Sequence, residues 1–278
     1  MKQTTQNLQN LLASLPKPIV AHIQHLERMR QDFVANVSHE LRTPLTVVQG
    51  YLEILLEQMP LEDLGKKILI QMQQQTMRMG NLVEDLLLLS RLEDSCLSNK
   101  YQKQIAVVKL ITHIIQEAKC LSGALNHTID CQLDPALYLR GMEGEVRSLF
   151  SNLIFNAVKY TPAGGNIKIR WYQIQELAYF SVEDNGIGIA SKHIPRLTER
   201  FYRVDKARSR SSGGTGLGLA IAKHVLIRHD ASLKVKSQLG KGSCFICCFP
   251  KKRVYVKNLC KKIGNRSLKK SLLLPQNC

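Results

Sequence analysis

The sequence of 278 residues has no long hydrophobic run. A membrane-spanning helix needs about 20 consecutive apolar residues, and no segment approaches that length. The N-terminal start, Met1 to Gln6, is too polar for a signal peptide. These absences predict a cytoplasmic chain, which would reach a membrane only through regions outside this sequence or weakly through its basic C-terminal end.

Paired cysteine arrays are also lacking. The eight cysteines are scattered, and the one C-x-x-C spacing, Cys244 to Cys247, falls in a strand-like run with no second pair of ligands nearby. Zinc sites of this type use two such pairs, and disulfides are rare in the cytosol. We therefore expect reduced thiols, most of them buried.

Acidic residues are absent from the last part of the chain. The formal net charge is +17, and residues 251–278 hold nine Lys or Arg and no Asp or Glu, so the first 250 residues carry +8. We interpret 251–278 as a basic, disordered tail and expect no direct nucleic-acid partner. Attraction of this tail to nucleic acid or to an acidic membrane is the alternative.

Three common nucleotide-binding signatures are missing. Gly240 to Ser243 does not supply the G-x-x-x-x-G-K-[ST] of a Walker A loop. The glycines of Gly214 to Gly218 are spaced G-x-G-x-G without a preceding strand, which excludes the dinucleotide fingerprint of βαβ units. An H-R-D catalytic loop of protein kinases is absent too.

Two long helical patterns occupy the first third of the chain. Residues 1–18 read as a linker remnant, and helices are predicted over about 19–58 and 61–92, with a break at Met59 and Pro60. This predicts an antiparallel helical hairpin domain at 19–95. Two helices alone cannot bury their wide apolar stripes, so we expect two hairpins to pair as a four-helix bundle in a homodimer.

A second domain is predicted over residues 100–250. Apolar alternation predicts strands, and helical periodicity returns in two segments. Strands in one layer and helices in the other define an α+β sandwich. The strands are predicted at 127–133, 166–172, 178–182 and 232–236, and the helices at 144–159 and 217–228.

His39 is the most informative residue of the predicted hairpin. Glu40 follows it directly, and Thr43 and Pro44 come next on the helical pattern, with the polar residues on a face that points to water. Neutral imidazole, with a pKa of about 6.5, is a competent nucleophile, and an adjacent carboxylate can accept its other ring proton. Taken alone, His39 would more simply be a surface histidine.

Two motifs of the second domain suit a nucleotide. Asn152, Asn156 and Lys159 share one helical face, which offers amide oxygens and an ammonium to Mg²⁺ and phosphates. Asp184 stands before two glycines, so it can accept a hydrogen bond from a purine amine while the backbone approaches the ring. Either motif alone also fits an ordinary polar helix face or loop.

Two further motifs follow in order. In the run Leu197 to Asp205, Arg200 or Arg203 can reach phosphate, and the glycine-rich run Gly213 to Leu219 opens a helix whose free N–H groups favour anions. The polar, basic segment between them is expected to be a flexible lid.

The run from Phe33 to Leu45 resembles the H-box of sensor histidine kinases. The four later motifs resemble the N, G1, F and G2 boxes of the ATP-binding domain shared by histidine kinases, gyrase-type ATPases, Hsp90 and MutL proteins. The resemblance implies that His39 is phosphorylated, that Glu40 is the general base, and that Thr43 serves in dephosphorylating a partner.

The same resemblance implies the ligands of ATP and Mg²⁺. It assigns Asn156 to Mg²⁺, Asp184 to the adenine amine and Arg203 to the γ-phosphate. The remaining residues that it assigns to the nucleotide site or its lid hinge are Asn152, Lys159, Tyr160, Gly186, Gly188, Gly214, Gly216, Leu217 and Gly218.

The implied activity is ATP-dependent phosphorylation of His39 and transfer to an aspartate on the receiver domain of a response regulator, with phosphatase activity on that regulator. The runs 33–50, 193–210 and 214–224 look most like the sensor kinases of phosphate regulons. Those kinases carry a membrane anchor and a PAS domain before the hairpin, and neither is in this sequence. The alternative is a dimeric scaffold or phosphatase for a regulator without kinase activity.

Overall fold

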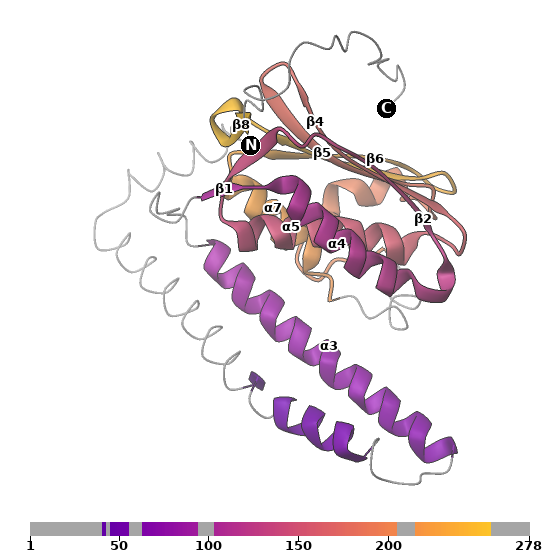
Figure 1. The fold of residues 1–278 in the computed structure, drawn as a ribbon. Coiled ribbons are helices and arrows are strands. Elements are labelled where there is room, and N and C mark those ends of the chain that lie inside the picture. Colours follow the sequence, from indigo (N-terminus) through magenta and orange to yellow (C-terminus); the bar gives the residue numbers. More distant parts are fainter. Residues whose placement is uncertain (1–40, 43–44, 56–62, 94–102, 205–214, 257–278) are drawn as a thin grey trace, which may run out of the picture. The chain divides into compact units, whose positions relative to one another are not determined.

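The computed structural model divides the chain into two compact units, residues 1–93 and 94–278, and each is described by itself (Figure 1). The structure describes residues 41–42, 45–55, 63–93, 103–204 and 215–256. Among these residues, no helix combines the length and the apolar composition that crossing a bilayer requires.

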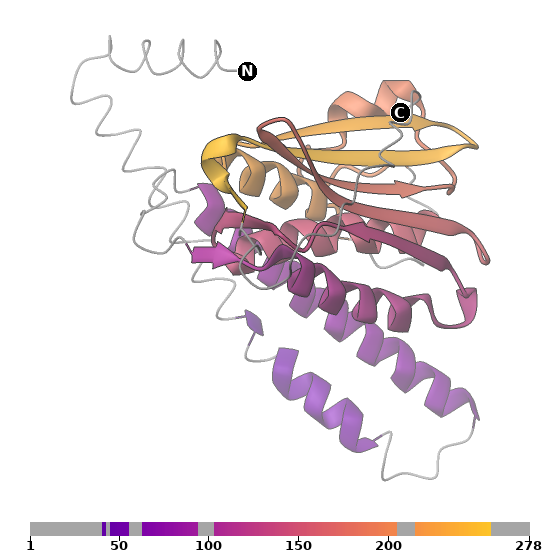
Figure 2. The ribbon, with the colours of Figure 1, turned by 45° about the horizontal axis from the view of Figure 1, so that its top comes forward.

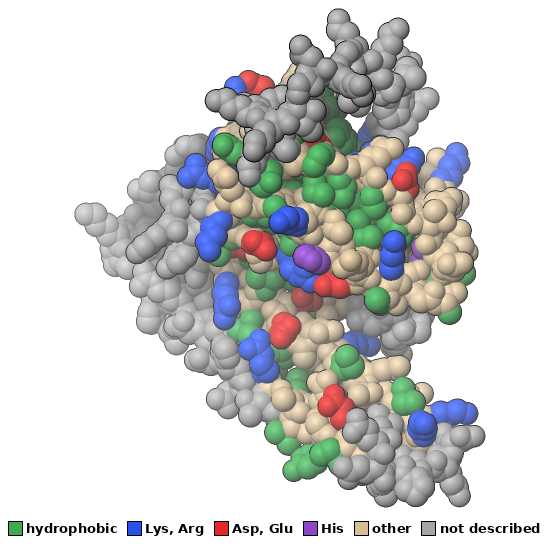
Figure 3. All heavy atoms as spheres, in the orientation of Figure 1, with side chains coloured by type: hydrophobic (Ala, Val, Ile, Leu, Met, Phe, Trp, Pro, Cys, Tyr) green, Lys and Arg blue, Asp and Glu red, His purple; other side chains and the backbone are tan. Residues whose placement is uncertain are grey.

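The first unit is helical wherever it is described. Residues 45–55 form one helix and α3 spans Asp63–Glu93, within the two segments predicted to be helical. Arg42, in the helical residues 41–42, lies 3.8 Å from the carboxylate of Glu84 on α3. Many large apolar side chains remain exposed, and hydrophobic side chains reach the surface of these helices in Figure 3. They include Val48, Tyr51, Ile68, Met72 and Met79.

A five-stranded sheet is the centre of the second unit. The strand order is β2-β4-β5-β7-β6, with β2 and β4 parallel and the other pairs antiparallel. Alternating burial along β4 and β7 shows that one face is covered and the other is partly exposed. The strands are β2 (Thr128–Leu133), β4 (Asn166–Ile174), β5 (Leu177–Asp184), β6 (Ser232–Gln238) and β7 (Gly242–Phe249).

Three helices lie in a layer against this sheet, as both ribbon views show (Figures 1 and 2). They are α4 (Val107–Ser122), α5 (Glu143–Tyr160) and α7 (Gly218–Arg228). The core between the layers is aromatic: Phe150 of α5 stacks on Phe180 of β5 with ring centroids 3.9 Å apart, and Trp171 and Phe249 meet edge to face. The indole N–H of Trp171 donates to the carbonyl of Leu137 at 3.1 Å. The predicted α+β layering is confirmed.

A second, three-stranded sheet was not predicted. Its order is β1-β3-β8, all antiparallel. Its strands are β1 (Lys103–Ile105), β3 (Leu137–Gly141) and β8 (Val254–Val256). Together with the short helix η4 (Lys251–Arg253), β8 makes the first six residues of the expected tail part of the fold. Residues 257–278 lie outside the described residues.

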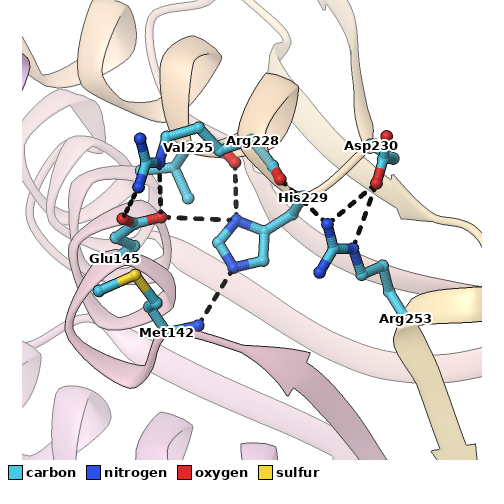
Figure 4. Close-up of polar contacts among 7 residues, drawn as sticks. All are labelled: Met142, Glu145, Val225, Arg228, His229, Asp230 and Arg253. Atoms are coloured by element: carbon cyan, nitrogen blue, oxygen red, sulfur yellow. Dashed lines mark hydrogen bonds and ion pairs between the residues drawn. The ribbon is translucent and has the colours of Figure 1, made fainter. Parts of the chain in front are cut away.

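A buried polar network joins the start of α5 to the end of α7 (Figure 4). At its centre Nδ1 of His229 donates to the carbonyl of Val225 at 2.8 Å, and Nε2 accepts the backbone N–H of Met142 at 3.4 Å. Burial lowers the pKa of His229, in keeping with this neutral imidazole. The backbone of Gly141 passes so close that a Cβ there would lie 2.3 Å from Nε2.

Charged side chains complete this network. Glu145, in the first turn of α5, pairs with Arg228 at 3.1 Å, and its other carboxylate oxygen lies 3.8 Å from Nδ1 of His229. Arg253 of η4 donates to the carbonyl of Arg228 at 3.2 Å and to Asp230 at 3.0 Å. The network therefore holds two helices and the beginning of β8 together.

Candidate nucleotide-binding site

A cavity of about 400 Å³ opens in the second unit, at the end of the helix layer where α7 begins. Its walls come from the second half of α5, the turn after β5, residues 197–204 and 215–219, and the start of β7. Nine of the residues predicted from the sequence line it together. They are Asn152, Asn156, Lys159, Tyr160, Asp184, Gly188, Arg203, Gly216 and Gly218.

The polar face of α5 forms one wall. Asn152 donates its amide N–H to the carbonyl of Ser148 at 2.9 Å, which turns its amide oxygen toward the start of α7. A Cβ on Gly218 would lie 2.3 Å from that oxygen, so only glycine fits there without a shift. Asn156 and Lys159 follow on the same helix face.

This wall also fits a hard cation. The described residues contain no group of three or more His, Cys, Asp or Glu that could hold a metal ion. Mg²⁺ can take an amide oxygen, nucleotide phosphates and water as ligands, because it usually keeps several waters. Asn156, the residue predicted to hold Mg²⁺, lines the cavity together with Asn152.

Asp184, at the end of β5, forms the opposite wall. Its Oδ1 accepts the backbone N–H of Gly186 at 2.9 Å and that of Ser243 at 3.2 Å. Burial raises the pKa of this carboxyl, whereas the two N–H donors act in the opposite direction. Because Oδ1 holds both backbone bonds, Oδ2 is the oxygen that can accept a ligand N–H in the cavity.

Close backbone contacts explain the glycines around Asp184. Gly188 has φ +65°, and a Cβ there would lie 1.9 Å from the carbonyl oxygen of Gln238. A Cβ on Gly186 would lie 2.4 Å from the carbonyl oxygen of Tyr160. Gly186 does not line the cavity itself; it supports Asp184 from behind.

A third wall joins two segments that are separated in the sequence. The backbone N–H of Phe201 donates to the carbonyl of Gly216 at 3.0 Å, and both residues have positive φ. Next to this bond, Tyr202 and Arg203 line the cavity, while Phe201 is exposed.

Some predicted residues are placed elsewhere. Leu217 is fully buried, and its backbone N–H is bonded to Oγ1 of Thr215, so it does not line the cavity. Gly214 and the predicted lid at 206–212 lie outside the described residues. The same holds for the predicted phosphotransfer residues of the first unit: His39, Glu40 and Thr43.

The structure adds wall residues that the motifs did not single out. They include Ile187, Ile189, Thr215, Leu219, Ser243 and Phe245. The apolar members lie inside the recognised motifs or on β7, and hydrophobicity alone does not distinguish a cavity wall from the core. Ser243 follows Gly242, whose φ is +106° and where a Cβ would lie 2.0 Å from the carbonyl oxygen of Asp184. The Gly-Lys-Gly-Ser run at 240–243 is the sequence signal for this turn, although it does not form a Walker A loop.

Two protein-family models match the chain. The His Kinase A (phospho-acceptor) domain matches residues 29–95, and the histidine kinase-, DNA gyrase B- and HSP90-like ATPase matches residues 141–253. The second match contains the cavity, and the first contains His39. The chain belongs to the sensor histidine kinases, the class with a phosphoacceptor helical domain followed by an ATPase-type domain.

Within this class the chain is similar to the phosphate regulon sensor protein PhoR. It is 55% identical to PhoR of Pseudomonas aeruginosa over 233 residues, which are 83% of this chain and 52% of that protein. It is 42% identical to PhoR of Haemophilus influenzae over 234 residues, 84% of this chain and 54% of that one. The chain thus spans about half the length of these curated relatives.

A solved structure supports the same fold. Full-length ShkA in complex with AMPPNP is 26% identical, with a TM-score of 0.66, over 79% of this chain and 45% of that one. The complex shows that a protein of this fold binds an ATP analogue. We conclude that the chain is a PhoR-like sensor histidine kinase.

Proposed function

We propose that the chain is an ATP-dependent protein-histidine kinase that phosphorylates its own His39. The observation that carries the proposal is the cavity in which Asp184, an acceptor for a purine amine, faces the same space as Asn152, Asn156 and Lys159. One end therefore recognises a base and the other suits phosphates. The family of the chain and its order of motifs point to the same donor, ATP.

The nucleotide pose follows from the walls. Adenine would lie against Asp184 and Gly188, with its amine donating to Oδ2 of Asp184. The phosphates would extend toward Lys159 and Gly216, where the N-terminal N–H groups of α7 begin. Mg²⁺, held by Asn156, phosphate oxygens and water, would supply charge neutralisation on the phosphates.

The chemical step conserves atoms and charge. A ring nitrogen of His39 attacks the γ-phosphorus, an N–P bond forms as the bond from phosphorus to the β,γ-bridging oxygen breaks, and ADP leaves. Glu40 accepts the proton from the other ring nitrogen, which prevents a positive charge from remaining on the imidazole. The phosphoryl group then passes to an aspartate carboxylate on a response regulator.

The wider assignment rests on the relatives. We infer that the regulator belongs to a phosphate-responsive system because both PhoR relatives are phosphate regulon sensors. Thr43 would serve in dephosphorylating that regulator.

The exposed apolar side chains of α3 and residues 45–55 support a homodimer, since a second hairpin would bury them. Because the reaction consumes ATP, we expect it to take place in the cytoplasm.

The test is labelling of the purified chain by ATP that carries radioactive phosphorus at the γ position. We expect an acid-labile, alkali-stable phosphoryl group that His39→Gln abolishes while nucleotide binding persists. His113→Gln, at an exposed position of α4, is the matched control and should label normally. Labelling that persists in His39→Gln would refute the assignment of the phosphorylated residue.

The same experiment separates the second candidate function. A scaffold or phosphatase without kinase activity would bind a phosphorylated regulator and release its phosphate, yet the wild-type chain would take up no label. The preserved nucleotide cavity favours the kinase over this alternative.

A further inference from the structure

Tyr202 in the cavity wall is held by a histidine that does not line the cavity. His193 lies on the short helix η3 (Ser191–Arg196), and its Nδ1 is 2.7 Å from the hydroxyl of Tyr202, a hydrogen bond in which either group can donate. The backbone N–H of His193 is itself bonded to the carbonyl of Ala190 at 2.9 Å. The tip of the tyrosine is therefore tied to a fixed backbone.

The ring of Tyr202 is restrained from a second side. The guanidinium carbon of Arg196 lies 4.3 Å from the ring centroid, a cation–π contact. Glu199 fixes this guanidinium through hydrogen bonds of 3.0 to 3.2 Å from Nε and Nη2. The carbonyl of Glu199 also accepts the backbone N–H of Tyr202 at 3.3 Å. One ring face is thus covered, the hydroxyl is bonded, and the ring contributes to the cavity wall.

The segment that leads into η3 is bonded to the five-stranded sheet and to the turn after β6. The backbone N–H of Ile189, just before η3, donates to Oγ of Ser237 on β6 at 2.8 Å, and the carbonyl of Ile187 accepts the N–H of Gly240 at 2.8 Å. Because η3 is bonded to β6 through this segment, His193 holds Tyr202 at a set position in the cavity wall.

We propose that His193 is a positioning residue for the nucleotide: by bonding the hydroxyl of Tyr202, it sets the orientation of the aromatic wall beside Arg203. This inference rests on the proposed function, because it takes ATP as the occupant of the cavity. His193 touches neither the reacting atoms nor the cavity, so its effect falls on nucleotide affinity rather than on phosphoryl transfer.

The experiment compares His193→Phe and Tyr202→Phe in the full chain. Each removes one partner of the same hydrogen bond and keeps a ring. We expect each to raise the Kd for ADP, measured by titration calorimetry, and the KM for ATP by about five- to tenfold, with kcat at saturating ATP within about twofold of wild type. The double variant should lose no more than either single variant, because both break one bond.

Two further variants separate positioning from a general structural role. His193→Asn places a polar atom near the position of Nδ1 and should recover part of the affinity, whereas His113→Phe, on the exposed side of α4, should leave Kd and KM unchanged. Unchanged Kd in His193→Phe, or losses that add in the double variant, would overturn the inference. Calorimetry with ADP does not depend on His39, so a wild-type chain that binds ADP without labelling would refute only the proposed kinase activity.

Discussion

The two ends of the packed helices α5 and α7 use polar residues in opposite ways. At one end Glu145 pairs with Arg228, and the buried imidazole of His229 bonds to the backbone of Val225 and Met142. At the other end Asn156 and Gly218 border a cavity of about 400 Å³. The same helix pair is therefore closed at one end and open to a ligand at the other.

This difference separates structural polar residues from functional ones. A group whose polar atoms are all bonded within the protein has no capacity left for a ligand, whereas a polar group in a cavity wall can keep one atom for it, as Asp184 keeps Oδ2. The closed end fixes the spacing of α5 and α7, and the start of α7 then meets Asn152 closely enough to require Gly218. Changes at the open end should alter nucleotide use, and changes at the closed end should alter stability.

The largest effect is expected at the open end. Asn156→Ala should reduce ATP-dependent labelling about a thousandfold, roughly 4 kcal/mol of activation free energy, because it removes the side chain assigned to Mg²⁺. Stability should change little. Ser151→Ala on the same helix, away from the cavity, is the control and should label normally. Rates are measured by initial labelling at saturating ATP; a loss below threefold would remove Asn156 from the metal site.

At the closed end we expect a loss of stability without a loss of nucleotide affinity. Glu145→Ala leaves the largely buried side chain of Arg228, 12% exposed, without its carboxylate partner and should lower the free energy of unfolding by about 3 kcal/mol, with the Kd for ATP unchanged. Trp171, the single tryptophan and fully buried in β4, reports unfolding of this unit in urea by fluorescence.

A double variant sharpens that result. Glu145→Leu combined with Arg228→Met replaces the ion pair by apolar side chains and should recover most of the lost stability. If Glu145→Ala instead weakened ATP binding tenfold at full stability, the closed end would be part of the nucleotide site and the comparison would fail.

Asp184→Asn tests the adenine end of the cavity. An amide whose oxygen keeps the N–H bonds of Gly186 and Ser243 must turn its NH₂ toward the adenine amine, so two donors would face each other. ATP affinity should fall about 30-fold, near 2 kcal/mol, because a buried donor is left unpaired. Asp130→Asn, exposed on β2, should bind normally. Equal affinity for ATP and GTP in the wild-type chain would argue against this recognition of adenine.

Sequence patterns predicted the elements whose structure depends on residues close together in the chain, such as single helices and long strands. The spacing of Asn152, Asn156 and Lys159 follows from the helical period, and the alternation of Ile167, Ile169 and Trp171, all buried, marks one face of β4. The short strands of the second sheet were missed, because three to five residues are too few to show alternation.

The parts of the fold and of the cavity that were not predicted depend on contacts between segments far apart in the sequence. Lys251 to Arg253 read as the start of a solvated tail, yet their charges meet Glu176 and Asp230, which lie far away in the sequence. Ser243 reaches Asp184 because β7 pairs with β5 in a register that places the two residues opposite each other. No spacing within one motif carries that information.

The smallest effect concerns pH at the closed end. Burial lowers the pKa of His229 below its ordinary value of 6.5, so the unfolded chain takes up this proton at a higher pH than the folded chain does. Stability should therefore be full above about pH 6.5 and fall as the pH drops toward the folded-state pKa, by at most about 1.4 kcal/mol per pH unit. The pKa of His224 is lowered as well, because of burial and the nearby charges of Arg200 and Lys223. His224 therefore also makes the folded state less stable as the pH falls. Urea midpoints followed by Trp171 fluorescence between pH 5.5 and 7.5 should depend less steeply on pH in His229→Gln and, separately, in His224→Gln. A pH dependence identical to wild type in His229→Gln would show that folding does not lower the pKa of this imidazole.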